Sequence, residues 1–139
     1  MKFGFLSKQI TDKPADKAVD SQAAHLQRGA QAEQIAATFL QQKGLILIEK
    51  NFRSKYGEID LIMREAETLV FIEVRLRSSQ QFGGAAASIS QSKQQKLSNT
   101  AEYYLQQHGQ NYAKYGCRFD AILMQTADIN AVEWLKNAF

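Results

Sequence analysis

Residues 57–77 read GEIDLIMREAETLVFIEVRLR, two apolar runs with a short polar segment between them. Residues 59–63 and 69–74 are rich in the β-branched and aromatic side chains that strands favour, and residues 64–67 have the polar composition of a turn. The stretch therefore predicts a β-hairpin. If the turn closes it symmetrically, the numbers of facing residues sum to 131.

One face of this hairpin carries carboxylates. In the symmetric register Asp60 is the diagonal neighbour of Glu73, and diagonal partners lie about 7–8 Å apart, near enough for both to hold one cation. Two like charges about 4 Å apart repel by about 4 kcal/mol at an effective dielectric of 20. Protons, basic neighbours or a bound cation must compensate for this repulsion between the carboxylates. The hairpin alone leaves two interpretations open: a shared cation site, or a solvated acidic face neutralised by Arg75 and Arg77.

The flanking segments predict two helices and three further strands. The expected helices cover about 21–43 and 90–107, and the expected strands cover 45–52, 118–124 and 131–135. The order α-β-β-β-α-β-β indicates an α/β fold in which helices flank a mixed β-sheet. Alternating Lys and Asp in residues 1–20 suggest a mobile N-terminal arm, and residues 21–139 a single domain.

Composition excludes several classes of protein. The chain has 139 residues, 45% of them hydrophobic, which is enough for one core, and its net charge is +3. No apolar run exceeds four residues, and the start has no apolar segment of signal-peptide length. With Cys117 as the one cysteine and only His25 and His108, neither a disulfide framework nor a Cys/His zinc site can form. We expect a soluble cytoplasmic protein.

The first predicted helix places Glu33 near the middle of its apolar arc. That arc contains Leu26, Ala30, Ala37 and Leu40. An ionised Glu facing a core is costly without a partner. Either Glu33 pairs with an arginine or extends to the edge, or it supplies a third carboxylate to the same cation. Lys93 begins the inner face of the second helix, as a surface charge or as a cation that meets a phosphate near the acids.

Basic residues surround these acids in the sequence. Residues 50–96 contain eight basic and five acidic side chains. Such a surround attracts a polyanion, although a solvated surface of mixed charge has the same composition. The candidates for contact with nucleic acid are Arg53, Arg75, Arg77, Lys93 and Lys96.

Six short motifs carry a resemblance to a known family. They are RGAQAE at 28–33, NFR at 51–53, GEIDLI at 57–62, FIEVRLR at 71–77, FGGAA at 82–86 and RFD at 118–120. In order and spacing they resemble the YraN family, small bacterial proteins of unproven role that are grouped with endonucleases. The resemblance covers about residues 25–139.

The YraN family is similar to the PD-(D/E)xK nucleases, with their restriction-endonuclease-like core, and to archaeal Holliday junction resolvases. The resemblance implies that Glu33 is the helix acid, Asp60 the strand Asp and Glu73 the Glu of Glu-x-Lys. Arg75 occupies the lysine position. Because arginine stays protonated, it cannot act as a base, but it can bind the scissile phosphate. Lys93 is the candidate to replace the lost amine.

The resemblance implies a Mg²⁺- or Mn²⁺-dependent endonuclease that acts on DNA, possibly branched or structured, with the metal on Asp60, Glu73 and Glu33. The alternative is a nucleic-acid-binding protein that lost turnover through Arg75. A third hypothesis is an adaptor that binds a protein through its C-terminal strand and Trp134. Resolvase-like nucleases often act as dimers, which makes a homodimer one expected state and leaves the oligomeric state open.

Overall fold

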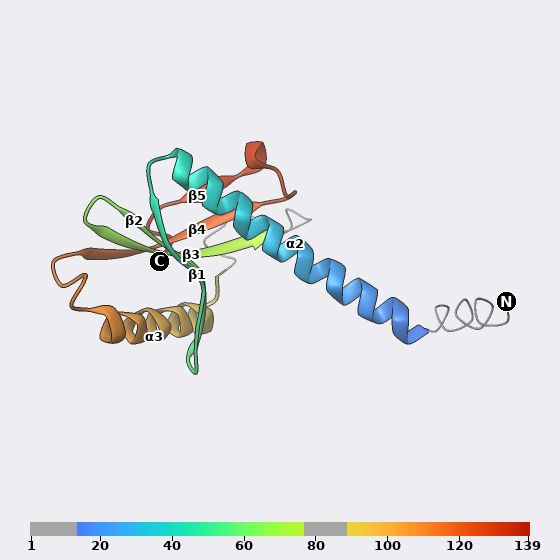
Figure 1. The fold of residues 1–139 in the computed structure, drawn as a ribbon, viewed down its shortest axis with the longest axis horizontal. Coiled ribbons are helices and arrows are strands. Elements are labelled where there is room, and N and C mark those ends of the chain that lie inside the picture. Colours follow the sequence, from blue (N-terminus) through green and yellow to red (C-terminus); the bar gives the residue numbers. More distant parts are fainter. Residues whose placement is uncertain (1–13, 77–88) are drawn as a thin grey trace, which may run out of the picture. The chain divides into compact units, whose positions relative to one another are not determined.

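The computed structural model describes residues 14–76 and 89–139 (Figure 1). It has eight elements in these residues: α2 (Pro14–Gln42), β1 (Ile46–Ser54), β2 (Gly57–Glu65), β3 (Thr68–Leu76), α3 (Gln91–His108), β4 (Gly116–Met124), the 3-10 helix η2 (Ile129–Ala131) and β5 (Glu133–Leu135). The predicted α/β fold and its order of elements are confirmed. The chain divides into two units, residues 1–31 and 32–139.

Helix α2 begins earlier than the sequence predicted. Its first residue is Pro14, inside the expected arm, and proline suits the first turn because the missing N–H has no partner there in any helix. The helix ends at Gln42, one residue before the predicted end, and Gly44 follows with a positive φ of 99°. The rest of the expected arm, residues 1–13, lies outside the described residues. None of the described helices combines the length and apolar character that crossing a bilayer takes.

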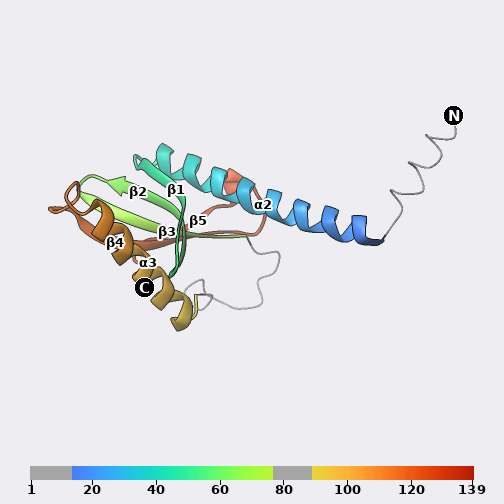
Figure 2. The same ribbon diagram turned by 60° about the horizontal axis from the view of Figure 1, so that its bottom comes forward.

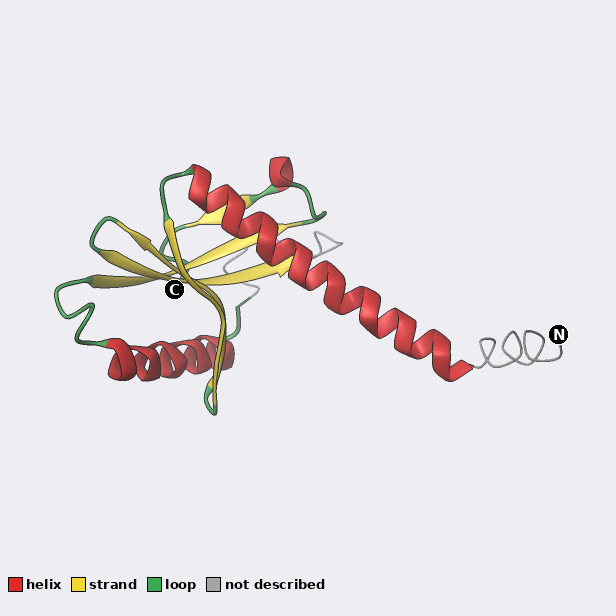
Figure 3. Cartoon of the chain, in the orientation of Figure 1, coloured by secondary structure: helices red, strands yellow, loops and turns green. Residues whose placement is uncertain are grey.

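The strands form one mixed sheet in the order β1-β2-β3-β4-β5. Strands β3 and β4 pair in parallel, and the other neighbours are antiparallel. A parallel pair needs a crossover connection, and α3 lies in the connection between β3 and β4 (Figure 3).

The register of the β2–β3 hairpin differs from our prediction. The hairpin closes at the pair Glu65 and Thr68, so the numbers of facing residues sum to 133, not 131. The turn is shorter than predicted because Ala66 adopts a positive φ of 50°, which allows a two-residue connection. A shift of two residues keeps Asp60 and Glu73 on one face of the hairpin. Continued by one pair, the observed register sets Asp60 directly opposite Glu73.

Both faces of the sheet are covered (Figure 2). On one face, Ala36 and Leu40 of α2 pack with Leu61 and Ile72. The predicted apolar arc of α2 is correct for its C-terminal part alone, because Leu26 and Ala30 are exposed. On the other face α3 covers a second core, which includes Ile59, Phe71, Leu97 and Tyr104.

The alternation of side chains along β2 is broken at Asp60, so that the residues on either side of it lie in different cores. Leu61 packs in the core under α2, whereas Ile59 packs in the core under α3. Strict alternation would leave both on one face. Beside this point Asn51 of β1 has a positive φ of 54°, a conformation that asparagine tolerates better than most residues. The distortion places the Asp60 side chain where elements from both faces of the sheet can reach it.

Candidate functional site

Two buried carboxyl groups form the centre of the candidate site. Asp60 of β2 and Glu73 of β3 are each only 8% exposed. The backbone N–H of Val74 donates to Asp60 Oδ2 at 2.8 Å, and the two carboxyl groups lie close enough together for each to shift the pKa of the other.

Glu73 keeps a proton to a higher pH than a free glutamate does. Burial raises the pKa of Glu73 to about 7, and the negative charge of Asp60 raises it further, while Lys93 and Arg75 act in the opposite direction. Burial also raises the pKa of Asp60, against the hydrogen bond from Val74. Both carboxyl groups therefore release their protons at a higher pH than exposed acids do.

Lys93 meets the pair from helix α3. Its Nζ lies 3.7 Å from Glu73 Oε2, and its side chain is 42% exposed. Ser90 caps the helix through a hydrogen bond from the Lys93 N–H to Ser90 Oγ of 3.1 Å, which fixes where the first turn begins. The ammonium group therefore contacts both the carboxyl pair and solvent, where a phosphate could approach it.

Glu33 reaches the site from α2. Its half-buried carboxyl has a raised pKa, first because of burial and second because of the negative charge of Asp60. A hydrogen bond with the Asn51 side chain acts in the opposite direction. Asn51 thus stands at the distorted point of β1 and lowers the pKa of Glu33, a role that sequence reasoning missed. Its signal was a residue of low strand propensity within a predicted strand.

The donor set suits a hard divalent cation. Carboxylate oxygens are the usual protein ligands of Mg²⁺, which commonly takes one or two of them and keeps several waters. Asp60 and Glu73 meet that requirement. Within residues 14–76 and 89–139, no group of three or more His, Cys, Asp or Glu side chains lies close enough together to hold a metal. Glu33 is therefore near Asp60 without forming a closed triad with the pair.

The predicted phosphate contacts are dispersed. Arg75 lies on the same face of β3 as Glu73, and its buried Nε has no hydrogen-bond partner among the described residues. Arg53 is exposed and pairs with Glu58 at 3.0 Å. Lys96 is exposed on α3, and Arg77 lies outside the described residues.

A third buried acid, Asp120 of β4, connects β4 to the C-terminal strand β5. Asp120 is fully buried and accepts hydrogen bonds from Arg118 Nε, from Trp134 Nε1 at 2.9 Å and from the Asn137 N–H at 3.0 Å. Trp134 also packs edge-on against Phe39, so its ring and its N–H are both engaged within the fold.

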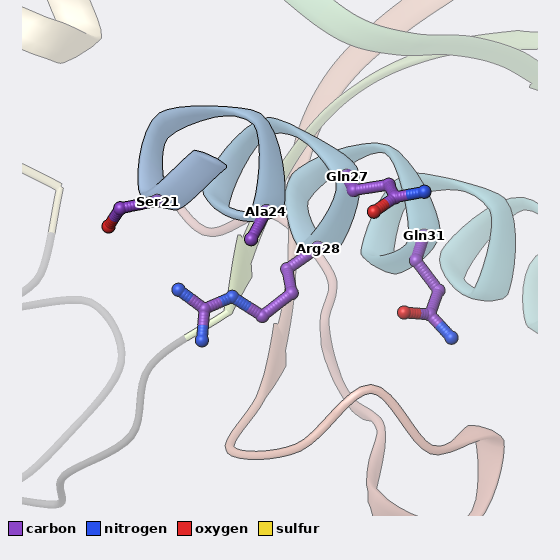
Figure 4. A pocket seen from close by; sticks show the side chains of 5 residues that line it. All are labelled: Ser21, Ala24, Gln27, Arg28 and Gln31. Atoms are coloured by element: carbon purple, nitrogen blue, oxygen red, sulfur yellow. The ribbon is translucent and has the colours of Figure 1, made fainter. Parts of the chain in front are cut away.

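The N-terminal part of α2 has a hollow on its surface. Its lining side chains all come from one helix (Figure 4): Ser21, Ala24, Gln27, Arg28 and Gln31. It contains none of the predicted site residues.

Comparison with known proteins finds relatives over most of the chain. The model of the Uncharacterised protein family UPF0102 matches residues 32–124. A UPF0102 protein of Nitrosomonas europaea is 55% identical over 112 residues, which are 81% of this chain and 92% of that protein. A UPF0102 protein of Methylobacillus flagellatus is 50% identical, with 81% of this chain and 96% of its own length covered. One of Shewanella loihica is 44% identical, with 84% and 97% covered. The matched region contains every member of the candidate site.

Proposed function

Because the chain belongs to the Uncharacterised protein family UPF0102, the YraN family that its motifs resemble, we propose a function from the site itself. The protein is a divalent-metal-dependent phosphodiesterase that cleaves DNA. The observation that carries this proposal is the buried Asp60–Glu73 pair with the Lys93 ammonium 3.7 Å from Glu73.

The buried pair has no obvious role in stability. Burying carboxyl groups opposes folding, and apolar side chains of the same size would pack there without that cost. Raised pKa values in a cluster of acids next to a cation are typical of functional sites. A cation bound to Asp60 and Glu73, with Glu33 nearby, would activate a water and neutralise charge on the phosphate.

The basic side chains have distinct roles in this proposal. Lys93 holds an amine beside Glu73, where it can orient a water molecule or contact a phosphate oxygen. Arg75 binds the phosphate through its guanidinium N–H groups and stabilises negative charge that develops there. The amine that the nuclease pattern places on the strand therefore comes from α3.

The alternative is a DNA-binding protein without turnover. The observation that favours it is Arg75 at the strand position where the nuclease pattern has lysine. The two functions share the prediction of salt-dependent DNA binding, and they differ in whether Mn²⁺ yields products.

Cleavage assays separate the two. Labelled junction, flap, duplex and single-stranded DNA would be incubated with the wild-type protein and Mn²⁺, and with Glu73→Gln. Glu102→Gln, an exposed acid on α3, is the matched control. We expect cleavage that Glu73→Gln lowers at least about 100-fold and that the control leaves unchanged. Binding without products from the wild type would favour the alternative, and products unaffected by Glu73→Gln would reject this site.

A further inference from the structure

The turn between β1 and β2 presents an aromatic side chain to solvent. Tyr56 is 41% exposed, and the Lys55 Nζ lies 5.2 Å from the centre of its ring. Behind Tyr56, the Tyr103 ring of α3 lies 5.8 Å away, and Phe52 lies 6.3 Å from Tyr103. Figures 1 and 3 show this turn projecting beyond the sheet, beside α3. An exposed ring supported by others offers an apolar face at the tip of a hairpin.

The tip is held in place by a hydrogen bond within the turn and by contact with α3. The Tyr56 N–H donates to Ser54 Oγ at 3.1 Å. Gly57 has a φ of 150°, and a Cβ at that position would come within 3.1 Å of Thr100 Oγ1. The backbone of the turn therefore lies directly against the helix. A ring on such a preorganised turn loses little conformational freedom when a ligand covers it.

The charge around the ring is mainly positive. Arg53 and Lys55 flank the turn, and Lys96 of α3 lies next to Gly57. Glu58 is the nearby acid, and it pairs with Arg53. Aromatic rings among cations form the usual surface for single-stranded nucleic acid, because bases stack on the rings and phosphates contact the cations.

Helix α3 connects this tip to the carboxyl pair. The backbone of Lys96 lies beside Gly57 of the tip, and Lys93, three residues before it, contacts Glu73. Three residues rise about 4.5 Å along a helix. A strand whose phosphate lies at Lys93 can therefore place a base a few nucleotides away on Tyr56.

We propose that Lys55, Tyr56 and Tyr103 form a stacking platform for an unpaired base. This inference rests on the proposed function, and it specifies the substrate class: DNA with single-stranded nucleotides beside the scissile phosphate. A base inside a duplex has both faces covered by its neighbours, so it cannot stack on the ring without first leaving the helix. The platform therefore selects single-stranded tails, gaps or branch points over intact duplex.

Binding measured without metal tests the platform separately from cleavage. Fluorescence anisotropy in EDTA at low salt would compare a fluorescein-labelled 12-nucleotide single strand with a duplex of the same length. Tyr56→Leu keeps apolar bulk and removes the ring. We expect it to weaken binding of the single strand about tenfold and binding of the duplex less than twofold. Tyr56→Phe, which keeps the ring, should stay within twofold of the wild type for both.

Two further variants examine the cation and its control. Lys55→Met should weaken binding of the single strand, whereas Lys114→Met, at an exposed site beyond the other end of α3, should not do so to the same degree. With 2-aminopurine in the strand, the wild type should quench its fluorescence by stacking, and Tyr56→Leu should abolish the quenching.

The outcomes distinguish this inference from the proposed function. Equal effects of Tyr56→Leu on single strand and duplex, or no effect on either, would overturn the platform even if Mn²⁺-dependent cleavage is found. Selective loss of single-strand binding and of quenching would support the platform even if the protein yields no products. A wild type that binds no DNA in EDTA at low salt would overturn the platform.

Discussion

Replacing Glu73 by glutamine should remove a pH dependence from the stability of the fold. Burial beside Asp60 raises the pKa of Glu73 from 4.5 to about 7. Between these values the folded protein keeps a proton that the unfolded chain releases. The contribution of Glu73 to the free energy of unfolding is therefore greatest below about pH 4.5. It falls as the pH rises to about 7. Asp60 and Glu33 also have raised pKa values, so they act in the same direction.

The size of the effect follows from the two pKa values of Glu73. The difference between 4.5 and about 7, at about 1.4 kcal/mol for each pH unit, corresponds to roughly 3 kcal/mol. The side chain is 9% exposed, so solvent screens little of it. Glutamine keeps the shape of the side chain, and its amide can donate to Asp60 at any pH. At pH 8 we expect Glu73→Gln to be more stable than the wild type by up to roughly 3 kcal/mol.

Urea unfolding in EDTA, followed by circular dichroism between pH 5 and pH 8.5, measures this directly. The wild type should lose stability steadily to about pH 7, and Glu73→Gln should show a much flatter profile. Glu102→Gln removes an exposed acid from α3 and should follow the wild type. Parallel profiles for the wild type and Glu73→Gln, or a wild type that gains stability over this range, would refute the argument that Glu73 is protonated in the fold.

Three further predictions concern other parts of the structure. Mn²⁺ at about 100 times its Kd should stabilise the wild type at pH 8 by about 2.7 kcal/mol and should not stabilise Asp60→Asn, because the pair is incomplete; equal thermal shifts would contradict this. Lys93→Met should move the loss of stability to higher pH, since Lys93 lowers the pKa of Glu73; an unchanged midpoint in the urea titrations would show that the ion pair does not form in solution. Asp120→Ala should cost about 3–5 kcal/mol, because it removes the buried acceptor of hydrogen bonds from Arg118, Trp134 and the Asn137 N–H, against about 1 kcal/mol for the exposed cap Asp128→Ala; similar urea midpoints for the two variants would disprove the structural role of Asp120.

The hairpin shows how far local pattern carries a prediction. Alternation along residues 57–77 assigned Asp60 and Glu73 to one face, because side chains alternate with a period of two wherever a strand forms. The register was wrong by two positions, since it depends on the turn, and nothing in the composition of residues 64–67 indicated that Ala66 would adopt a positive φ. The observed register brings the two carboxyl groups closer than the diagonal arrangement we predicted.

Helix α2 shows the corresponding limit for helices. Its periodicity predicted one apolar arc from Leu26 to Leu40, but burial is confined to the part from Ala32 onward. A helix of suitable composition continues whether or not a sheet lies beneath it, so periodicity alone cannot say where packing begins. Glu33 stands at the start of the buried part, which is why it is half-buried and close to Asp60.

The amino-acid sequence by itself determined the type and order of the elements, the face on which each acid lies, and the family. The element types and the faces follow from contacts between residues a few positions apart, and the family follows from the order and spacing of the six motifs. Only the tertiary structure decided that Asp60 and Glu73 are buried beside each other, that Lys93 meets them from α3, and that the tip carrying Tyr56 lies against the same helix. These contacts join residues 13 to 43 positions apart, and their geometry depends on how the sheet twists and where each helix packs.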